Sequence, residues 1–285
     1  MLLNSLTYHA PRTTAEAAKL YSELPEVKIL AGGTFLLNSL ELLKKKGTRT
    51  PLNILSLRKI ADLKGVFSDN KTLTIRAMTH INDLFDSSHL TDNFALLRTV
   101  CRNISTHPIR NMATVGGNLT CRYTWTEMGA VMIALDAVMH FIDAQGAETT
   151  LGAEDFFKNA AKSDKIFTHV TIARDKAASI AYRRVKKSLH VDIPLLAVCV
   201  KTNFKGKQFT NTRVTVNNGI NFAQRDYKLE NFLNQSQCHP DLPQQALDHL
   251  EAAIYDTRSI DYKKYMFRAS LKSAIKELVE RSLRK

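Results

Sequence analysis

Long apolar runs are missing from this chain of 285 residues. No stretch approaches the roughly eighteen uninterrupted apolar residues that a membrane-spanning helix needs, so we expect no membrane segment. The N-terminal stretch MLLNSLTYHAPRT lacks the basic residues and the apolar length of a secretory signal. We therefore expect a cytoplasmic protein with no membrane partner.

Cysteine is scarce and scattered. The four cysteines, Cys101, Cys121, Cys199 and Cys238, lie about twenty or more residues apart and form no CxxC pair. This spacing argues against a zinc or iron–sulfur site within this chain alone and against a disulfide framework. The sequence also lacks HExxH, paired-carboxylate and Ser–His–Asp patterns. We therefore predict no metal ligand and no catalytic side chain.

Basic residues outnumber acidic ones by 40 to 27, which gives a formal net charge of +13. They are scattered and form no stripe interleaved with aromatic residues, as a nucleic-acid-binding surface would require. We predict no nucleic-acid partner. The positive charge suits a ligand that carries phosphate, or an acidic partner.

Glycine is also scarce, but four of the 11 glycines form two doublets, Gly32-Gly33 and Gly116-Gly117. The first doublet follows an apolar run, residues 27–31, that predicts a buried strand, and it precedes leucines at helical spacing. Such a turn leaves N–H groups at a helix N-terminus, where the helix dipole favours an anion. The absence of a Cβ atom lets a ligand approach the backbone. We therefore predict an anion-binding turn over residues 31–34.

The second doublet lies in ATVGGNL, residues 113–119, again after a β-prone run. Two doublets in a glycine-poor chain suggest two loops that close on one ligand. Short glycine motifs also occur by chance, so a pair of ordinary turns is an alternative of equal weight. The chain has no GxGxxG motif, which excludes a Rossmann-type site.

The predicted elements divide the chain into three lobes, over residues 1–58, 59–176 and 177–285. Strands are predicted over residues 71–77, 138–142, 166–172, 179–185, 193–203 and 208–217. Helices are predicted over residues 15–24, 79–87, 92–103, 127–137, 227–233, 242–253 and 259–284. In the last helix, the stripe that contains Tyr262, Tyr265 and Ile275 is expected to face the core.

The glycine doublets belong to two longer motifs, AGGT at residues 31–34 and IRNMATVGGNL at residues 109–119. With these motifs the chain resembles, along nearly its whole length, the FAD-binding (medium) subunit of the xanthine dehydrogenase and carbon monoxide dehydrogenase family of molybdenum hydroxylases. The second motif is similar to that family's RN-x-AT-[IV]-GGN signature. Three weaker matches occur in the same order: EDFF at residues 154–157, YRRVKKSLHVDIPLLAV at residues 182–198 and DTRSIDYKKYM at residues 256–266.

The resemblance implies an α+β fold. A two-subdomain FAD-binding, PCMH-type domain is expected over residues 1–176, divided near residue 58. A C-terminal domain like that of the carbon monoxide dehydrogenase flavoprotein is expected over residues 177–285. The resemblance also implies an extended FAD whose pyrophosphate lies on the two glycine loops. This agrees with the anion-binding turn predicted above, because backbone N–H groups hold phosphates without a charged side chain.

Carried over residue by residue, the resemblance implies a set of FAD-binding positions. They are Ile29, Leu30, Ala31, Gly32, Gly33, Thr34, Phe35, Leu36, Ile104, Thr114, Val115, Gly116, Gly117, Asn118, Glu127, Phe167 and Arg183. The N–H groups of Gly32, Gly33 and Thr34 are expected to donate to the phosphates.

Single positions in this set have individual expected roles. Thr114 Oγ is expected to bond the diphosphate, and Asn118 to bond a phosphate or brace the turn. Glu127 matches an acid that bonds the adenosine ribose, whereas Arg183 matches a base near the flavin ring. Ile104 and Phe167 match apolar contacts. Without these roles, Glu127 would be an ordinary helix-start acid, Arg183 a solvated strand residue, and Ile104 and Phe167 core residues.

One segment departs from the family pattern. Residues 119–128, LTCRYTWTEM, lack the usual Ser-Pro, contain the bulky Tyr123 and Trp125, and have Glu127 in place of an Asp. This departure keeps open a second hypothesis, a flavin-free subunit that only scaffolds an assembly.

The resemblance implies that the chemistry belongs to the cofactor. A partner subunit with a molybdenum cofactor hydroxylates the substrate, and an iron–sulfur small subunit passes electrons through [2Fe–2S] clusters to FAD. NAD⁺ is the expected acceptor. The chain is thus expected to be the FAD subunit of a heterotrimeric, xanthine dehydrogenase-type oxidoreductase. A stand-alone FAD-linked oxidase is the remaining alternative, although the chain lacks the large substrate domain of such enzymes.

Overall fold

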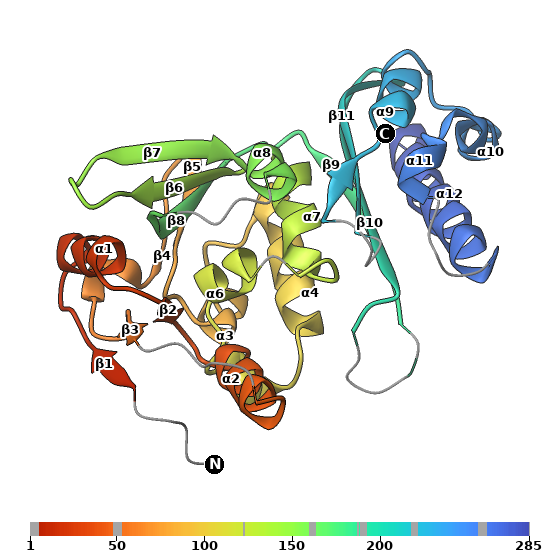
Figure 1. The fold of residues 1–285 in the computed structure, drawn as a ribbon. Coiled ribbons are helices and arrows are strands. Elements are labelled where there is room, and N and C mark those ends of the chain that lie inside the picture. The colour runs from red at the N-terminus through yellow and green to blue at the C-terminus, as the bar shows by residue number, and fades with distance from the viewer. Residues whose placement is uncertain are drawn as a thin grey trace.

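The computed structural model describes residues 6–47, 53–121, 123–159, 164–186, 188, 193–217, 222–255 and 261–284. Its strands form three sheets, with helices between and around them (Figure 1). The sheets draw their strands from residues 7–56, 66–173 and 179–225. The lobe boundaries predicted near residues 58 and 176 remain predictions.

The N-terminal sheet has three parallel strands in the order β1 (Thr7–His9), β3 (Asn53–Ser56) and β2 (Val27–Leu30). Helix α1 (Thr14–Glu23) begins after Thr13, whose hydroxyl accepts the Glu16 N–H at 3.2 Å and so caps the helix. Helix α2 (Leu36–Lys45) follows β2 across the first glycine doublet. The predicted strand–turn–helix is therefore present.

The second sheet is antiparallel, in the order β4 (Val66–Ser68), β5 (Thr72–Arg76), β8 (Ile166–Ala173), β6 (Val138–Ile142) and β7 (Glu148–Gly152). Sequence patterns predicted β5, β6 and β8 but missed the edge strands β4 and β7.

Helices accompany this sheet and share its core. They are η1 (Ala61–Leu63), α3 (Ile81–Phe85), η2 (Asp92–Phe94), α4 (Ala95–Asn103), α5 (His107–Arg110), α6 (Val115–Thr120), α7 (Glu127–Ala134) and α8 (Ala153–Lys158). Every residue of α7 is buried, because this helix lies between the core of the second sheet and residues 196–217 of the chain.

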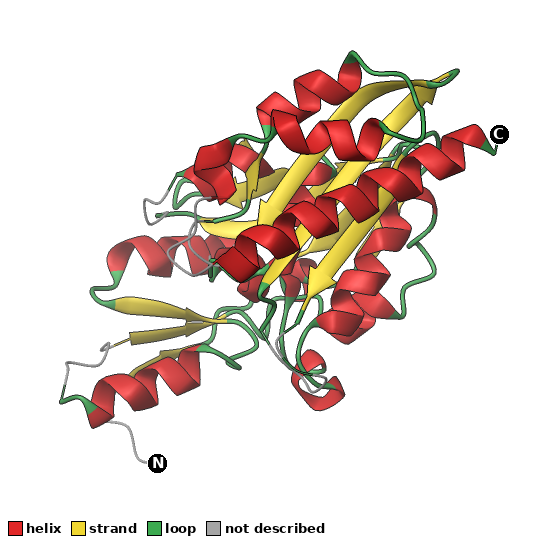
Figure 2. Cartoon of the chain, turned by 90° about the vertical axis from the view of Figure 1, so that its right-hand side faces the viewer, coloured by secondary structure: helices red, strands yellow, loops and turns green. Residues whose placement is uncertain are grey.

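The third sheet is antiparallel, in the order β12 (Gln224–Arg225), β11 (Gln208–Asn217), β10 (Leu196–Lys205) and β9 (Ser179–Val185). The bounds of β9 and β11 are those predicted. The sheet packs against α9 (Tyr227–Asn234) and the long α12 (Asp261–Leu283), which ends at the C-terminus and crosses the strands in Figure 2.

Two helix predictions in this region were wrong in part. Residues 242–253 do not form one helix but α10 (Leu242–Gln245), the 3₁₀ turn η3 (Ala246–His249) and the beginning of α11 (Ala252–Tyr255). In α12, Ile275 is buried as expected, but Tyr262 and Tyr265 are 57% and 66% exposed, and Phe267 and Leu271 are buried. The first two residues of the helix predicted over 259–284 lie outside the described residues.

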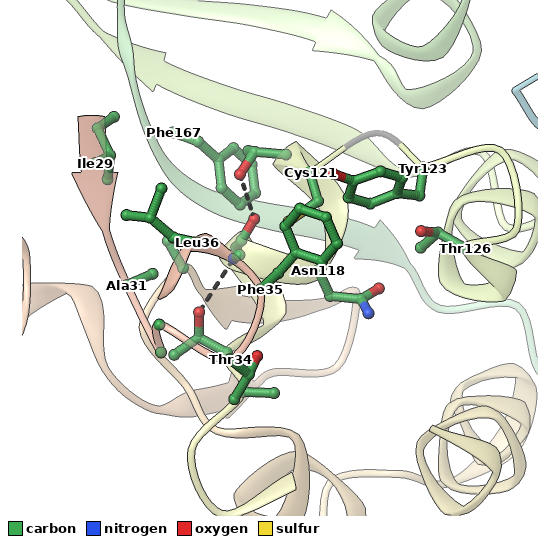
Figure 3. Close-up of a pocket in the computed structure, with 18 of the residues that line it drawn as sticks. Ile29, Ala31, Thr34, Phe35, Leu36, Asn118, Cys121, Tyr123, Thr126 and Phe167 are labelled. Carbon is green, nitrogen blue, oxygen red and sulfur yellow. Dashed lines mark hydrogen bonds between the residues drawn. The ribbon is translucent and has the colours of Figure 1, made fainter. Parts of the chain in front are cut away.

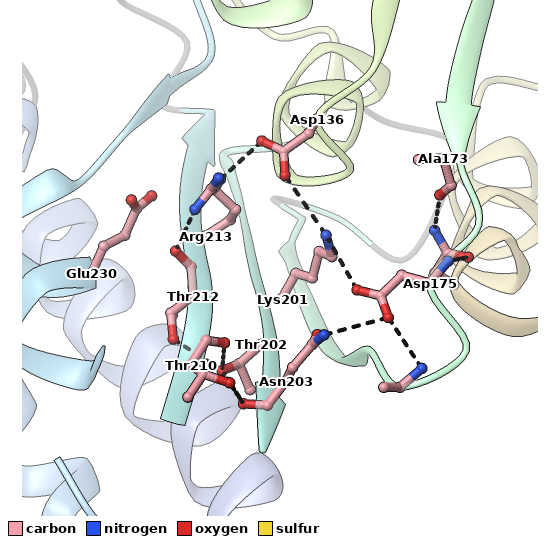
Figure 4. A network of polar contacts seen from close by, with 12 residues as sticks. Asp136, Ala173, Asp175, Lys201, Thr202, Asn203, Thr210, Thr212, Arg213 and Glu230 are labelled. Atoms are coloured by element: carbon pink, nitrogen blue, oxygen red, sulfur yellow. Dashed lines mark hydrogen bonds and ion pairs between the residues drawn. The ribbon is translucent and has the colours of Figure 1, made fainter. Parts of the chain in front are cut away.

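Charge pairs join the third sheet to the rest of the molecule. The sheet supplies the bases and earlier residues supply the acids: Arg184–Glu127 and Arg213–Asp136 at 2.9 Å, Lys201–Asp136 and Lys201–Asp175 at 3.7 Å, and Arg225–Glu154 at 3.2 Å. Figure 4 shows Lys201 between Asp136 and Asp175. We call these five pairs the charged seam. Among the described residues, no helix has both the length and the apolar character needed to span a membrane.

Candidate cofactor site

A cavity of about 1260 Å³ opens beside both glycine loops (Figure 3). Most of the predicted FAD-binding positions line it: Ile29, Ala31, Gly32, Gly33, Thr34, Phe35, Leu36, Ile104, Thr114, Gly116, Gly117, Asn118, Glu127 and Phe167. Leu30, Val115 and Arg183 do not. The two motifs, about eighty residues apart in sequence, therefore border one space.

The first loop offers free backbone donors. Gly33 has φ +74°, a conformation that residues with a Cβ atom rarely adopt, and its carbonyl accepts the Leu37 N–H at 3.2 Å to begin the first turn of α2. The N–H groups of Gly32, Gly33 and Thr34 donate no hydrogen bond to any described residue. Three such donors beside a cavity, at the start of a ten-residue helix, suit a phosphate.

Gly32 has a different purpose from Gly33. A Cβ atom on Gly32 would lie 2.0 Å from the carbonyl oxygen of Met112. The first loop therefore packs directly on the backbone that precedes the second loop. Gly32 is required for contact between the loops rather than for ligand approach.

The second loop donates most of its N–H groups to other atoms of the protein. The Gly116 N–H bonds Ala77 O at 2.7 Å, the Val115 N–H bonds Thr79 O at 2.9 Å, and the Gly117 N–H bonds Thr114 Oγ1 at 3.0 Å. Val115 is fully buried, which explains its absence from the cavity wall. Thr114 Oγ1 is the N-cap acceptor of α6, and its hydroxyl hydrogen is left as a donor for a ligand.

Asn118 carries an unpaired polar atom into this region. Its Oδ1 is buried and has no hydrogen-bond partner among the described residues, although its backbone N–H is satisfied by Thr114 O at 2.9 Å. Buried side-chain polar atoms normally have partners. A polar ligand in the cavity would provide one, so the residues present fit a cofactor that bears phosphate and hydroxyl groups.

Glu127 lines the cavity, but its carboxylate is already engaged. Both of its oxygens accept from Arg184 Nε at 2.9 Å, and the Tyr182 hydroxyl donates to Oε1. Burial raises the pKa of Tyr182, and the Glu127 carboxylate raises it further, so Tyr182 stays protonated as a donor. The predicted ribose bond of Glu127 remains a prediction, and it would have to share this carboxylate.

Arg183 lies outside the cavity wall. Its guanidinium bonds Glu277 at 2.6 Å and Ser273 Oγ at 3.0 Å, both on α12, away from the cavity. Successive residues of a strand point to opposite faces, so the neighbouring Arg184 lines the cavity instead. Arg184 is therefore the base of this strand that lines the cavity, and the expected approach of Arg183 to the flavin ring remains a prediction.

Apolar side chains form a large part of the remaining wall. Ile104 and Phe167 lie in it, as the resemblance implied, together with Leu36, Leu40, Leu43, Phe141 and Phe156. The leucines occupy one face of α2. Leu40 is nearly fully buried, whereas Leu36 and Leu43 are only partly buried. An apolar wall beside phosphate donors suits a planar ring joined to a diphosphate.

Sequence reasoning did not assign Tyr123 and Trp125 to the site. Both line the cavity, and with Phe35 they form a stack of rings. The available signal was the departure of residues 119–128 from the family pattern. No three His, Cys, Asp or Glu side chains in the described parts of the chain gather as metal ligands would.

This combination of fold and cavity defines an α+β protein whose cavity, bordered by backbone donors, fits a phosphate-bearing cofactor. Residues 4–174 match the family described as the FAD binding domain in molybdopterin dehydrogenase, and the chain belongs to that family.

Characterised relatives agree with this assignment. The carbon monoxide dehydrogenase medium chain of Afipia carboxidovorans is 29% identical over 216 residues, which cover 74% of this chain and 73% of that one. The xanthine dehydrogenase FAD-binding subunit of Escherichia coli O157:H7 is 27% identical over 141 residues, 49% of this chain and 47% of that one. A solved structure of carbon monoxide dehydrogenase from Hydrogenophaga pseudoflava superposes with a TM-score of 0.87 at 25% identity, covering 96% of this chain and 97% of that chain.

These comparisons confirm the family that the sequence motifs indicated and the α+β fold class. They also confirm FAD as the cofactor of the family and an oxidoreductase as the class of enzyme. The individual FAD contacts, the partners, the acceptor and the cytoplasmic location remain predictions.

Proposed function

We propose that this chain is the FAD-binding electron-transfer subunit of a molybdenum hydroxylase. In this proposal, a small subunit with [2Fe–2S] clusters delivers electrons, and a large subunit with the molybdenum cofactor hydroxylates the substrate. The final acceptor is NAD⁺. FAD supplies the redox chemistry when bound, because a flavin accepts electrons singly and delivers a hydride.

The observation that carries the proposal is the set of free N–H groups at Gly32, Gly33 and Thr34 beside the cavity. We assign the FAD diphosphate to these donors. The second loop contributes the Thr114 hydroxyl and the Asn118 Nδ2 as further donors. The buried Asn118 Oδ1, which has no partner among the described residues, can accept from a hydroxyl group of the cofactor. This division of work explains why the site needs no basic side chain at the phosphates.

The protein's own residues bind and orient the cofactor. The apolar wall that includes Ile104 and Phe167 excludes water from the ring system. Arg184 and Glu127 form a buried ion pair at the same cavity and fix the third sheet against it. No side chain is assigned a proton-transfer or nucleophilic role, in agreement with the absence of catalytic motifs in the sequence.

The test is to isolate an affinity-tagged copy of the chain from its own cells under mild conditions. We expect two further polypeptides, iron and molybdenum in the isolated assembly, and reduction of added NAD⁺ when the substrate is supplied. A flavin-containing chain that isolates alone would contradict the subunit assignment and favour a stand-alone oxidase. An intact assembly that reduces oxygen or a dye but not NAD⁺ would contradict only the acceptor.

One observation favours a second candidate, the flavin-free scaffold. Tyr123 and Trp125 occupy part of the cavity wall, and Glu127 is already paired. An assembly with full molybdenum and iron content but no flavin in this chain would support the scaffold.

A further inference from the structure

Three aromatic side chains contact one another in a row in the cavity wall, with Phe35 tilted against Tyr123 and Tyr123 stacked on Trp125. The Phe35 and Tyr123 ring centroids are 4.2 Å apart at an interplanar angle of 49°, and those of Tyr123 and Trp125 are 4.4 Å apart at 18°. Phe35 comes from the first glycine loop, and the other two come from the segment between α6 and α7. Figure 3 shows Phe35 and Tyr123 close to Asn118 and Cys121. We call these three rings the aromatic stack.

The aromatic stack is not part of a core. All three rings line the cavity, and Phe35 and Trp125 are 38% and 36% exposed. Tyr123 lies between its two neighbours, so the free aromatic surface belongs to the two outer rings. Exposed aromatic surface within a concave site is the feature that planar ligands use.

The position of the stack relates it to the phosphate donors. Phe35 directly follows Thr34, so the stack begins one residue from the N–H groups assigned to the diphosphate. A dinucleotide held there carries a heteroaromatic ring on each side of its diphosphate. Either ring has the flat π-face that an indole prefers to stack on.

We propose that the aromatic stack is a binding platform for one planar ring of the cofactor, with Trp125 as the contacting and affinity-determining residue. This inference rests on the proposed function, since it requires a dinucleotide on the first loop. The shared chemistry is a planar heteroaromatic ring, either the adenine or the isoalloxazine.

The test compares the wild-type chain with Trp125→Leu and Trp125→Phe by equilibrium dialysis against FAD, ADP and FMN. We expect Trp125→Leu to weaken FAD binding about five- to tenfold and Trp125→Phe to restore most of the affinity. The half-ligand that loses affinity identifies the ring: ADP for adenine, FMN for isoalloxazine. Tyr265→Leu is the matched control, because Tyr265 is an exposed aromatic residue that does not line the cavity.

A spectroscopic readout separates stacking from general damage. Trp125 is the only tryptophan of the chain, so intrinsic indole fluorescence reports this ring alone. Under adenine stacking, ADP quenches this emission, and it cannot do so by energy transfer because it does not absorb there. Under isoalloxazine stacking, bound FMN is more fluorescent in Trp125→Leu than in the wild type.

Each contrary outcome has a distinct meaning. Trp125→Leu that binds FAD, ADP and FMN with wild-type affinity overturns the platform and leaves the FAD site standing. Equal losses in Trp125→Leu and Trp125→Phe also overturn it, since they indicate a packing role. A folded wild-type chain that binds none of the three ligands contradicts the proposed function together with the platform.

Discussion

The two glycine loops and one pair of the charged seam border the cavity, but backbone contacts form the loops whereas side-chain contacts form the seam. The loops are shaped by backbone contacts, such as the approach of Gly32 to Met112 and the hydrogen bond from Gly116 to Ala77. The seam is shaped by side-chain pairs, of which Arg184–Glu127 reaches the cavity. The comparison shows that one wall depends on the absence of side chains, whereas the other depends on two particular ones.

The largest expected effect comes from placing a side chain on the loop wall. Gly33→Asp would add a negative charge to the loop whose N–H groups are assigned to the diphosphate, at a residue with φ +74°. We expect FAD affinity to fall at least about 100-fold, because backbone strain and charge repulsion act together. Flavin retained after gel filtration measures the effect.

The matched control for this variant is Gly146→Asp. Gly146 has φ +81°, nothing lies within 4 Å of an added Cβ atom, and the residue is outside the cavity wall. It therefore imposes similar backbone strain without the phosphate. Equal flavin loss in both variants would mean that strain, and not the diphosphate, explains the result.

The next largest effect is expected at the charged seam. Arg184→Gln would leave the Glu127 carboxylate buried without its cation, since the two side chains are only 8% and 4% exposed. Removing one partner of a buried pair costs about 3–5 kcal/mol. We expect the free energy of unfolding, measured with urea, to fall by that order and FAD affinity to fall with it.

The adjacent arginine provides the comparison for the seam. Arg183 pairs with Glu277, and their side chains are 29% and 30% exposed, so Arg183→Gln should cost no more than about 1 kcal/mol. It should leave FAD affinity unchanged, because Arg183 does not line the cavity. If Arg183→Gln weakened FAD binding more than Arg184→Gln, the assignment of Arg184 to the cavity would be wrong.

A smaller effect should separate the two glycines of the first loop. Gly32→Ala would place a methyl group 2.0 Å from Met112 O, so the two loops must move apart. We expect a loss of about 1–3 kcal/mol in unfolding free energy, the usual cost of overpacking. Unlike Gly33→Asp, this variant should lower stability even without FAD, and unchanged stability of the FAD-free chain would argue against the loop contact.

The smallest effect is expected outside both walls. His140 and His169 are opposite each other on β6 and β8, with rings stacked at 4.0 Å. Burial lowers the pKa of both, that of His169 to about 4, and the neighbouring His140 lowers it further. In the unfolded chain both histidines have the ordinary pKa of about 6.5 and bind protons more readily than in the folded chain. The stability that depends on their neutral form is therefore complete above about pH 6.5, and it is lost as the pH falls toward about 4.

His169→Gln tests this origin of acid sensitivity. The variant should lose less stability between pH 7 and pH 4.5 than the wild type does, as measured by urea midpoints. The same pH dependence in both proteins would place the acid-sensitive group elsewhere, and the charged seam would then be the next region to examine.

The features that could be predicted from the sequence are those that depend on residues close together in the chain. The strand–glycine–helix unit and the bounds of β9 and β11 follow from apolar spacing and turn residues. Fourteen of the predicted site residues line the cavity. Most of them belong to the two glycine motifs, whose residue types determine the backbone conformation of the loops.

The features that escaped prediction depend on tertiary contact. Nothing local distinguishes Arg183 from Arg184, since only the packing of β9 decides which one points to the cavity. Tyr262 and Tyr265 have the spacing of a core stripe, yet α12 packs through Phe267 and Leu271. The pairing of Glu127 with Arg184 joins residues 57 positions apart, and no sequence pattern encodes such a pair.

We assign FAD to the cavity beside the glycine loops. The most direct measurement is the visible absorption spectrum of the purified wild-type chain, followed by heat release of the flavin and its identification by chromatography. We expect a flavin spectrum and about one FAD per chain. A folded chain that contains no flavin, and takes up none when FAD is added to it alone or to its isolated assembly, would contradict this assignment.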